Sequence, residues 1–327
     1  MMSVVTGASG HVGGNLVRAL LAEGREVRVL IHHDRRAIEG LDVEVVEGDV
    51  CDPASLRRAF AGADIVYHLA VHTSILTTDW PLCEAVNVLG TRNVVEACLA
   101  CGARRLVHFS SIHALRQEPL DVPVDESRPL VEDSSYPPYD RSKAAAEKEV
   151  QKGIERGLDA IIISPTGVIG PYDFRPSHFG EVLLALAGGK MPALIESGFD
   201  WVDVRDVVQG ALRAEKLAAR GARYLLSGHW ASMRDLAAMI AEISGVPAPR
   251  FASPMWAARL AAPLLTALAQ LTRQRPLCTS ASLKALCGNP CISHERATRE
   301  LNYQPRPLRE TLADTLRWFA DNSYLLM

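Results

Sequence analysis

Short apolar runs alternate with amphipathic segments along the first half of the chain. The runs lie at 3–5, 26–31, 43–46, 63–71, 104–111 and 159–164. Nearly continuous apolar runs of this length are typical of strands that are buried on both faces of a sheet. Between them, residues such as Val12, Leu16 and Leu20 recur at helical spacing, and longer helices are expected at about 82–101 and from about Tyr139 onward. The alternation predicts an α/β fold, a Rossmann-type doubly wound parallel sheet covered by helices.

The pattern loosens after Pro165, where Gly and Pro become frequent. Segment 201–214 resembles one helix and 223–228 one strand, and we expect 200–228 to return to a dinucleotide-binding domain formed by 1–169. Residues 170–199 and 229–327 would then form a smaller C-terminal substrate-binding lobe over the strand ends, where open α/β sheets bind ligands.

One segment of the expected lobe, 255–271, is strongly apolar. Arg259 and Pro263 interrupt it, and it is shorter than the roughly 20 residues that a membrane-spanning helix needs. We expect a buried or pocket-lining helix, and the alternative is a peripheral membrane contact through 255–271.

Composition narrows the classes of partner. The net charge of −3 over 327 residues offers no basic field for nucleic acid. The chain opens without the basic segment and apolar core of a secretory signal, so we expect a cytoplasmic location, with its seven cysteines reduced. Cys98 and Cys101, with Cys287 and Cys291, could complete a zinc site, but we favour apolar filling of a helix face and expect no metal.

The stretch TGASGHVGG follows the first apolar run and precedes the first helix. Its glycines Gly7, Gly10 and Gly13 have the spacing GxxGxxG inside a strand–turn–helix unit. Glycine lets the main chain approach a pyrophosphate, and a helix N-terminus presents free N–H groups to the anion. The turn therefore predicts dinucleotide binding, and we include the intervening Ser9, His11 and Val12 among the contacts.

The residue at the end of the second strand usually contacts the ribose of the cofactor. A carboxylate there would accept from the 2′-hydroxyl, but this chain has His32, with Arg35 and Arg36 shortly after it. Since arginine accommodates a 2′-phosphate, we favour NADP over NAD. Asp34 keeps NAD open as the alternative.

A YxxxK pair, Tyr139 and Lys143, stands at the start of a predicted helix. Residues four apart share a helix face, and an ammonium beside a phenol favours the phenolate. We therefore expect Lys143 to lower the pKa of Tyr139, so that this phenol exchanges a proton with a substrate alcohol or carbonyl.

These motifs occur together with HLAV at 68–71, NVLGTRN at 87–93, FSS at 109–111 and PTGVIGP at 165–171. The combination resembles the extended short-chain dehydrogenase/reductases, the NAD-dependent epimerase/dehydratase family, and within it the dihydroflavonol reductase and 3β-hydroxysteroid dehydrogenase branch. The likeness covers nearly the whole chain. It implies that Tyr139 is the acid/base, that Lys143 lowers its pKa and holds the nicotinamide ribose, and that Ser111 rather than Ser110 bonds the substrate oxygen.

The resemblance also implies further cofactor contacts: Asp49 and Val50 at the adenine, Leu69, Ala70 and Val71 along the cofactor channel, Asn87 and Ser110, and Pro165 with Gly167 and Val168 near the carboxamide. Asn87 could instead cap a helix, and Asp203 could fix a turn or touch ligand. Two departures weaken a sugar-nucleotide assignment: Ser164 precedes the proline where many sugar-nucleotide enzymes have arginine, and IHALR follows Ser111 in place of a tyrosine-glycine pair.

The leading hypothesis is an NAD(P)-dependent oxidoreductase that moves hydride between nicotinamide and a secondary alcohol or ketone of a mostly apolar small molecule. The alternative is a nucleotide-sugar epimerase or dehydratase, for which Arg175, Arg234, Arg259 and Arg273 could hold a diphosphate. The family resemblance also implies a homodimer that pairs through helices at about 82–101 and 139–153, whose faces carry Val86, Leu89, Val94, Ala144 and Ala145.

Overall fold

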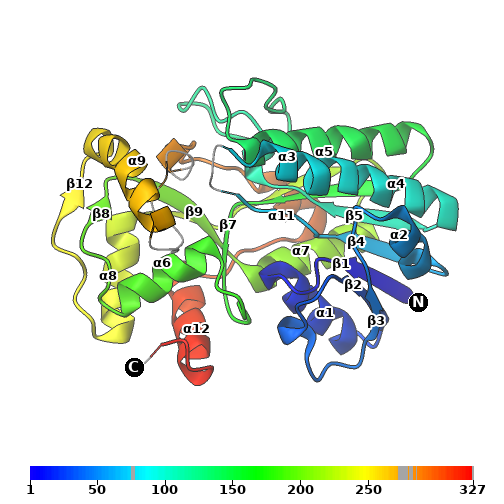
Figure 1. Ribbon diagram of the computed structural model, residues 1–327, viewed down its shortest axis with the longest axis horizontal. Helices are drawn as coiled ribbons and strands as arrows, with labels where there is room; N and C mark the ends of the chain where they lie inside the picture. The colour runs from blue at the N-terminus through cyan, green and yellow to red at the C-terminus, as the bar shows by residue number, and fades with distance from the viewer. Residues whose placement is uncertain (75–77, 272–278, 280–282, 285, 326–327) are drawn as a thin grey trace.

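A seven-stranded parallel sheet forms the centre of the computed structural model, which describes residues 1–74, 78–271, 279, 283–284 and 286–325 (Figure 1). The strand order is β10-β6-β5-β4-β1-β2-β3. The strands are β1 (Met2–Thr6), β2 (Glu26–Ile31), β3 (Glu44–Glu47), β4 (Ile65–His68), β5 (Arg105–Phe109), β6 (Ala160–Pro165) and β10 (Arg223–Leu226). The reversal of direction beside β1 makes the sheet doubly wound, so the predicted fold class is confirmed.

Both faces of the sheet are covered by helices, as its continuous apolar strands require. Val4 points into a core shared with α2 (Pro53–Phe60), α4 (Gly90–Cys101) and α5 (Pro138–Glu155). The next residue, Val5, points into the opposite core, shared with α1 (His11–Ala22), α7 (Val204–Leu217) and α11 (Glu295–Leu301). Short helical turns complete this part of the chain: η1 (Arg36–Ile38), α3 (Trp80–Cys83), the π-helical η2 (Glu84–Leu89) and η3 (Ile112–Ala114).

A third apolar core lies beyond the large sheet, under β7 (Gly167–Ile169), β9 (Gly198–Asp203) and β11 (His229–Ser232), which form a three-stranded sheet of order β11-β9-β7. Trp201 and Phe319 are fully buried in this core. The surrounding elements are α6 (His178–Ala187), β8 (Leu194–Ile195), α8 (Met233–Ser244), β12 (Ala252–Ser253), α9 (Met255–Leu271) and α12 (Leu308–Asp321). In Figure 1 this group lies on the side of the molecule away from β3, with α9 at its outer edge.

The prediction of one helix over 201–214 is wrong at its beginning. Residues 201–203 belong to β9, which pairs with β7 on one side and β11 on the other. Asp203 then caps α7, because its carboxylate accepts from the backbone N–H of Arg205 at 2.7 Å. Of the two roles left open for Asp203, the structure supports the one in which it fixes a turn.

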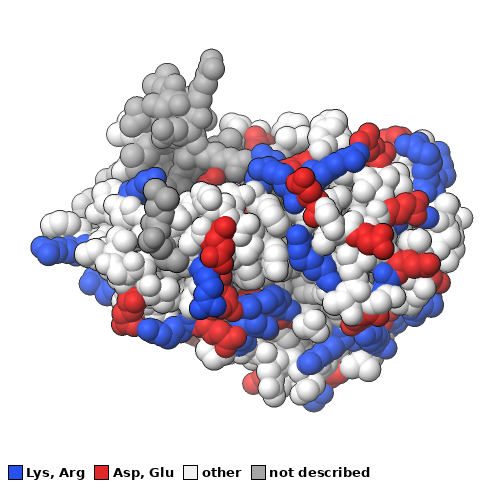
Figure 2. All heavy atoms as spheres, turned by 90° about the horizontal axis from the view of Figure 1, so that it is seen from below, with Lys and Arg blue, Asp and Glu red and all other residues white. Residues whose placement is uncertain are grey.

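Lys and Arg are interspersed with Asp and Glu over the face that Figure 2 shows, with no extended field of one sign there. Among the described residues, no helix is both long enough and apolar enough to cross a bilayer.

Candidate active site

The register of three neighbouring strands brings the sequence motifs to one edge of the sheet. Thr6 pairs with His68, and His68 pairs with His108, all at the carboxyl ends of their strands. The residues that follow these positions therefore share that edge: Gly7, then Leu69 and Ala70, then Ser110 and Ser111. This is the edge where open parallel sheets bind ligands.

The glycine turn is packed too closely for side chains at two of its positions. Gly7 has φ +73°, and a Cβ there would lie 2.5 Å from the backbone N of Ala70. A Cβ on Gly13 would lie 2.2 Å from the carbonyl oxygen of Gly7. Only glycine permits this contact between the turn, the first helix and the chain after β4.

Helix α1 begins at His11 with no acidic residue in its first turn. The preceding Gly10 has no side chain to cap it, so the N-terminus presents backbone N–H groups and the positive end of the helix dipole. Ser9 and Val12 are half-buried around this turn, and His11 Nε2 lies 3.1 Å from the carbonyl oxygen of Pro171. These features fit a dinucleotide pyrophosphate, which would be held by backbone amides of this turn.

Exposed charged residues follow β2. Arg36 makes a bidentate ion pair with Asp34, with Nε to Oδ1 at 3.0 Å, and Arg35 pairs with Glu47. The hydrogen bond from Arg36 holds the pKa of Asp34 below its ordinary value, and Arg175 contributes to the same shift. His32 is exposed and stacks on His33 with ring centroids 3.9 Å apart. Both arginines that were expected to read a 2′-phosphate are therefore paired with carboxylates in this structure.

The residues expected near the adenine form a tight turn after β3. Asp49 accepts from the backbone N–H of Cys51 at 2.8 Å, which holds its carboxylate within the turn. Val50 is buried, and its carbonyl oxygen accepts from the Asn93 amide at 3.0 Å. The structure thus places Asp49 partly exposed at the edge and the Val50 side chain in the core beneath it.

Beyond β4, Leu69 and Ala70 are half-buried and Val71 is exposed. Asn87 is buried and holds this segment: its amide donates to His72 O at 3.0 Å and to Ser142 Oγ at 2.8 Å, and its Oδ1 accepts from His72 N at 2.7 Å. Asn87 is therefore not a helix cap, because it ties the chain after β4 to helix α5.

A buried polar network behind this edge was not anticipated from the sequence. His68 Nδ1 lies 2.8 Å from Thr6 Oγ1, and its Nε2 lies 3.0 Å from Thr91 Oγ1. Burial lowers the pKa of His68 to about 3, assisted by the nearby charge of Lys143. His68 is therefore neutral at ordinary pH and bridges β1, β4 and α4.

The two serines after β5 have different partners. Ser110 is buried, and its hydroxyl donates to Glu147 Oε1 at 2.5 Å. Glu147 is itself fully buried and forms an ion pair with Arg223 from β10. Ser111 caps η3 by accepting from His113 N at 3.2 Å, and its hydroxyl is near enough to Tyr139 to oppose the upward pKa shift of that phenol. Ser111 is thus the serine beside Tyr139, while Ser110 is turned toward the glutamate.

Tyr139 and Lys143 lie one turn apart at the start of α5, which begins at Pro138. Lys143 is buried, and its Nζ donates to the carbonyl oxygen of Phe109 at 2.6 Å. Burial lowers the pKa of Lys143 to about 8, and the charge of Glu147 opposes this shift. Burial also raises the pKa of Tyr139 to about 12. Loss of hydration therefore dominates at Tyr139, so the net shift of its pKa in this structure is upward, and the lowering by Lys143 stays a prediction.

Aromatic side chains lie beside the phenol. The ring of His113 is 6.3 Å from that of Tyr139 and 5.8 Å from that of Phe199, between centroids. Pro165 is buried at the end of β6. Gly167 and Val168 lie in β7, where a Cβ on Gly167 would lie 2.6 Å from the Phe199 ring. The residues expected to contact the carboxamide therefore lie next to the aromatic side chain of Phe199.

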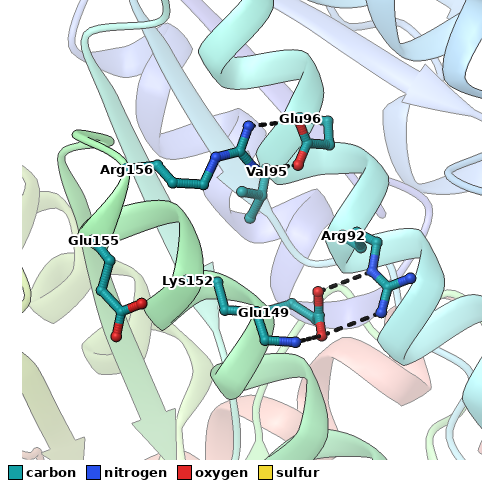
Figure 3. A pocket seen from close by; sticks show the side chains of 7 residues that line it. All are labelled: Arg92, Val95, Glu96, Glu149, Lys152, Glu155 and Arg156. Carbon is teal, nitrogen blue, oxygen red and sulfur yellow. Dashed lines mark hydrogen bonds and ion pairs between the residues drawn. The ribbon is translucent and has the colours of Figure 1, made fainter.

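A surface hollow of about 410 Å³ lies between α4 and the far half of α5, ten or more residues beyond Tyr139. Figure 3 shows Arg156 paired with Glu96, and Glu149 held between Arg92 and Lys152. This outer face is charged, whereas Val94 and Ala144, which were expected at a dimer interface, are buried in the protomer core. The expectation that those two residues face a partner is therefore wrong.

Two of the cysteines considered for a zinc site, Cys98 and Cys101, lie near the end of α4. Cys98 is buried against α2 and β4 in the sheet core, and Cys101 is half-buried beside it. Cys278 lies outside the described residues. Within the part of the chain that the structure describes, no three His, Cys, Asp or Glu side chains converge as a metal site would require.

A doubly wound sheet with a glycine turn at its carboxyl edge, and with serine, tyrosine and lysine beside that turn, is the arrangement of a nicotinamide-dependent oxidoreductase. Comparison with known proteins gives the same class. The model of the NAD-dependent epimerase/dehydratase family matches residues 3–225. The chain belongs to this family of extended short-chain dehydrogenase/reductases, as the sequence motifs predicted, and is an NAD(P)-dependent oxidoreductase.

Two curated relatives align over nearly the whole chain. Sterol demethylase protein B of Methylococcus capsulatus is 36% identical, with 99% of this chain and 100% of the relative covered. A putative dihydroflavonol 4-reductase of Synechocystis is 32% identical, over 98% of this chain and 95% of the relative. The crystal structure of gox2253 superimposes with a TM-score of 0.87 at 33% identity, over 99% of each chain.

Proposed function

We propose that the protein transfers hydride between a nicotinamide cofactor and a secondary alcohol or ketone of a mostly apolar small molecule. The observation that carries the proposal is the meeting of Ser111, Tyr139 and Lys143 at the edge that also holds the glycine turn. Ser110 is engaged with Glu147, so Ser111 remains to bond the substrate oxygen. The substrate lobe is assigned to 170–199 and 229–327.

Tyr139 acts as the proton donor in the reduction direction. With a pKa of about 12 it is protonated at neutral pH, which suits donation to the oxygen of a carbonyl as it becomes an alkoxide. Bound nicotinamide supplies or accepts the hydride. Oxidation of an alcohol requires the phenol to lose its proton first, so it benefits from a charged Lys143 nearby and from higher pH.

An apolar substrate is supported by the surroundings of Tyr139. Phe199 is packed against His113 on one side and Phe179 on the other, with ring centroids 5.8 and 5.2 Å apart. The names of the two curated relatives refer to a sterol and to a dihydroflavonol. A nucleotide-sugar epimerase stays the second candidate, because Arg234 lines a pocket of about 470 Å³ with Trp230.

NADP(H) is the preferred cofactor of this proposal, with NAD(H) as its alternative. His32 stands where a ribose-binding carboxylate would be, and Arg36 and Arg175 both lie close enough to act on Asp34. A 2′-phosphate would compete with Asp34 for Arg36. The residues proposed to contact the cofactor are those expected from the sequence. They begin with the glycine turn, Gly7 to Gly13, and end with Pro165, Gly167 and Val168. A homodimer and a cytoplasmic location stay predictions.

Turnover of apolar ketones with NADPH tests the proposal. A reductase consumes NADPH in step with product, whereas an epimerase interconverts sugar nucleotides with no net change in nicotinamide absorbance. We expect Tyr139→Phe to bind cofactor but to lose about 10²- to 10⁴-fold in turnover, with a milder loss for Ser111→Ala. Tyr136→Phe is the matched control, because the hydroxyl of Tyr136 bonds Glu118 at 2.9 Å in the preceding loop. An active Tyr139→Phe would contradict the assigned proton donor.

A further inference from the structure

Helix α9 exposes apolar side chains on the face that a surface helix normally fills with polar residues. Its inner face packs through Ala258 and Ala262 against Leu283. Its outer face carries Trp256, Leu260 and Leu264, spaced four residues apart. These side chains are 68%, 71% and 74% exposed, and Phe251, just before the helix, is 75% exposed. We call Phe251, Trp256, Leu260 and Leu264 the α9 patch.

The sequence around the α9 patch has an unusual charge distribution. Residues 243–294 contain no aspartate or glutamate but carry Arg250, Arg259, Arg273, Arg275 and Lys284, in a chain whose net charge is −3. Arg250 and Arg259 are exposed next to the patch, and Arg259 bonds Cys287 Sγ at 3.4 Å. An apolar stripe flanked by arginines, with an aromatic residue at its start, matches the chemistry of an interface between anionic headgroups and acyl chains.

We propose that the α9 patch docks the protein on the surface of an anionic lipid bilayer. The apolar side chains enter the headgroup and acyl boundary, and Arg250 and Arg259 meet lipid phosphates. The inference concerns this surface alone and does not depend on which substrate the enzyme turns over.

A second copy of the chain fits the α9 patch less well. The four side chains expose roughly 600 Å² together, less than the ~800 Å² per partner of a stable protein interface. In a two-fold pair the same patch faces itself, so Arg250 and Arg259 of both copies would be brought together with no carboxylate from 243–294 between them. An anionic membrane supplies the opposite charge and needs no matching shape.

Co-sedimentation of the full chain with lipid vesicles tests the proposal. Vesicles of phosphatidylcholine alone are compared with vesicles that contain about one third phosphatidylglycerol, at about 0.1 M salt, where surface charges still act over about 10 Å. We expect binding to the anionic vesicles at least about tenfold tighter than to the neutral ones, and weaker binding as salt rises.

Three variants locate the contact. Trp256→Ser combined with Leu260→Ser should reduce binding to anionic vesicles by at least about tenfold, and Arg250→Ser combined with Arg259→Ser should abolish the preference for anionic lipid. Leu217→Ser is the matched control, because Leu217 is 65% exposed at the end of α7 and should bind as the wild type does. Melting temperatures check that each variant is folded.

The experiments distinguish membrane docking from the other roles that the α9 patch could have. Absence of wild-type binding to either vesicle, or unchanged binding by the Trp256→Ser/Leu260→Ser variant, overturns the proposal. A wild-type dimer that this variant converts to a monomer, without vesicle binding, assigns the α9 patch to a subunit contact instead. Retained activity of the variant on a water-soluble substrate separates loss of docking from loss of catalysis.

Discussion

Glu147 should control the charge of Lys143. The two residues are one turn apart on α5, and Glu147 is fully buried. Its negative charge opposes the effect of burial, which lowers the pKa of Lys143 to about 8. Glu147→Gln removes that charge while keeping an oxygen that can accept from Ser110. We therefore expect the pKa of Lys143 to fall further.

The size of the effect follows from Coulomb's law. Side chains one turn apart are separated by about 6 Å, and with an effective dielectric constant of about 20 the interaction is about 3 kcal/mol, which is ~2 pKa units. Since Arg223 already neutralises part of the charge of Glu147, we expect a fall of about one to two units. At pH 7.5 the fraction of Lys143 that is protonated would drop from about three quarters to about one quarter for a fall of one unit and to about 3% for a fall of two units.

The lowered pKa of Lys143 can be detected by measuring the affinity for the cofactor as a function of pH. If charged Lys143 holds the nicotinamide ribose, the dissociation constant of NADPH should rise as pH passes through the pKa of Lys143. This rise should begin one to two units lower in Glu147→Gln than in the wild type, by the estimate above. Glu149→Gln is the control, because Glu149 lies two residues further along α5 and pairs with Arg92 and Lys152 on the outer face.

A second variant should shift the pKa of Lys143 in the opposite direction. Arg223→Gln leaves the charge of Glu147 without its guanidinium partner, so the pKa of Lys143 should rise and cofactor binding should persist to higher pH. Simple loosening of the buried network would move both variants in the same direction. Identical pH profiles for Glu147→Gln and the wild type, or shifts of the same sign in both variants, would refute the electrostatic role of Glu147.

Three further predictions concern the cofactor site and assembly. Gly13→Ala should weaken cofactor binding by at least about tenfold and lower the melting temperature, since its Cβ would lie 2.2 Å from Gly7 O. Gly10→Ala is the control and should have a milder effect, because its Cβ would lie 3.3 Å from the same oxygen. Titration should favour NADPH over NADH, and Arg36→Ser should reduce that preference; tighter NADH binding in the wild type would point to Asp34 as the ribose acceptor. Light scattering at micromolar concentration should give the mass of a dimer, and a monomeric mass would contradict the predicted pairing.

The inner strands of the sheet were predictable because they are short and buried on both faces. Val4 and Val5 pack into opposite cores, so neither face needs a polar residue and the apolar run stands out in the sequence. The same logic failed at 201–203. There β9 has the apolar Trp201 and Val202 next to each other, and Val202 and Val204 continue into the apolar stripe of α7, so that the change of period is hidden.

Polar residues inside apolar runs could not be assigned partners from the sequence. His68 and Thr91 are 23 positions apart, and the register of β1 with β4 and the packing of α4 against the sheet are both needed to place them and Thr6 in one network. Glu147 had a usable signal, because Tyr139, Lys143 and Glu147 recur every four residues on one face of a predicted helix. Its partner Arg223 had none, since β10 had first to be paired with β6.

Tyr139 illustrates why the spacing of two residues in the sequence does not by itself predict a pKa. The spacing of Tyr139 and Lys143 indicates an attraction between an ammonium and a phenolate, but it does not reveal how much water either group keeps. In the folded chain the ammonium bonds Phe109 O and both groups lose hydration, so the pKa of Tyr139 moves up and that of Lys143 moves down. Each shift favours the neutral form, which leaves a protonated donor at the substrate and a lysine whose charge depends on Glu147. A charge brought to this edge by the cofactor would act on both groups at once, so the pH dependence of turnover should differ between the oxidised and reduced cofactor.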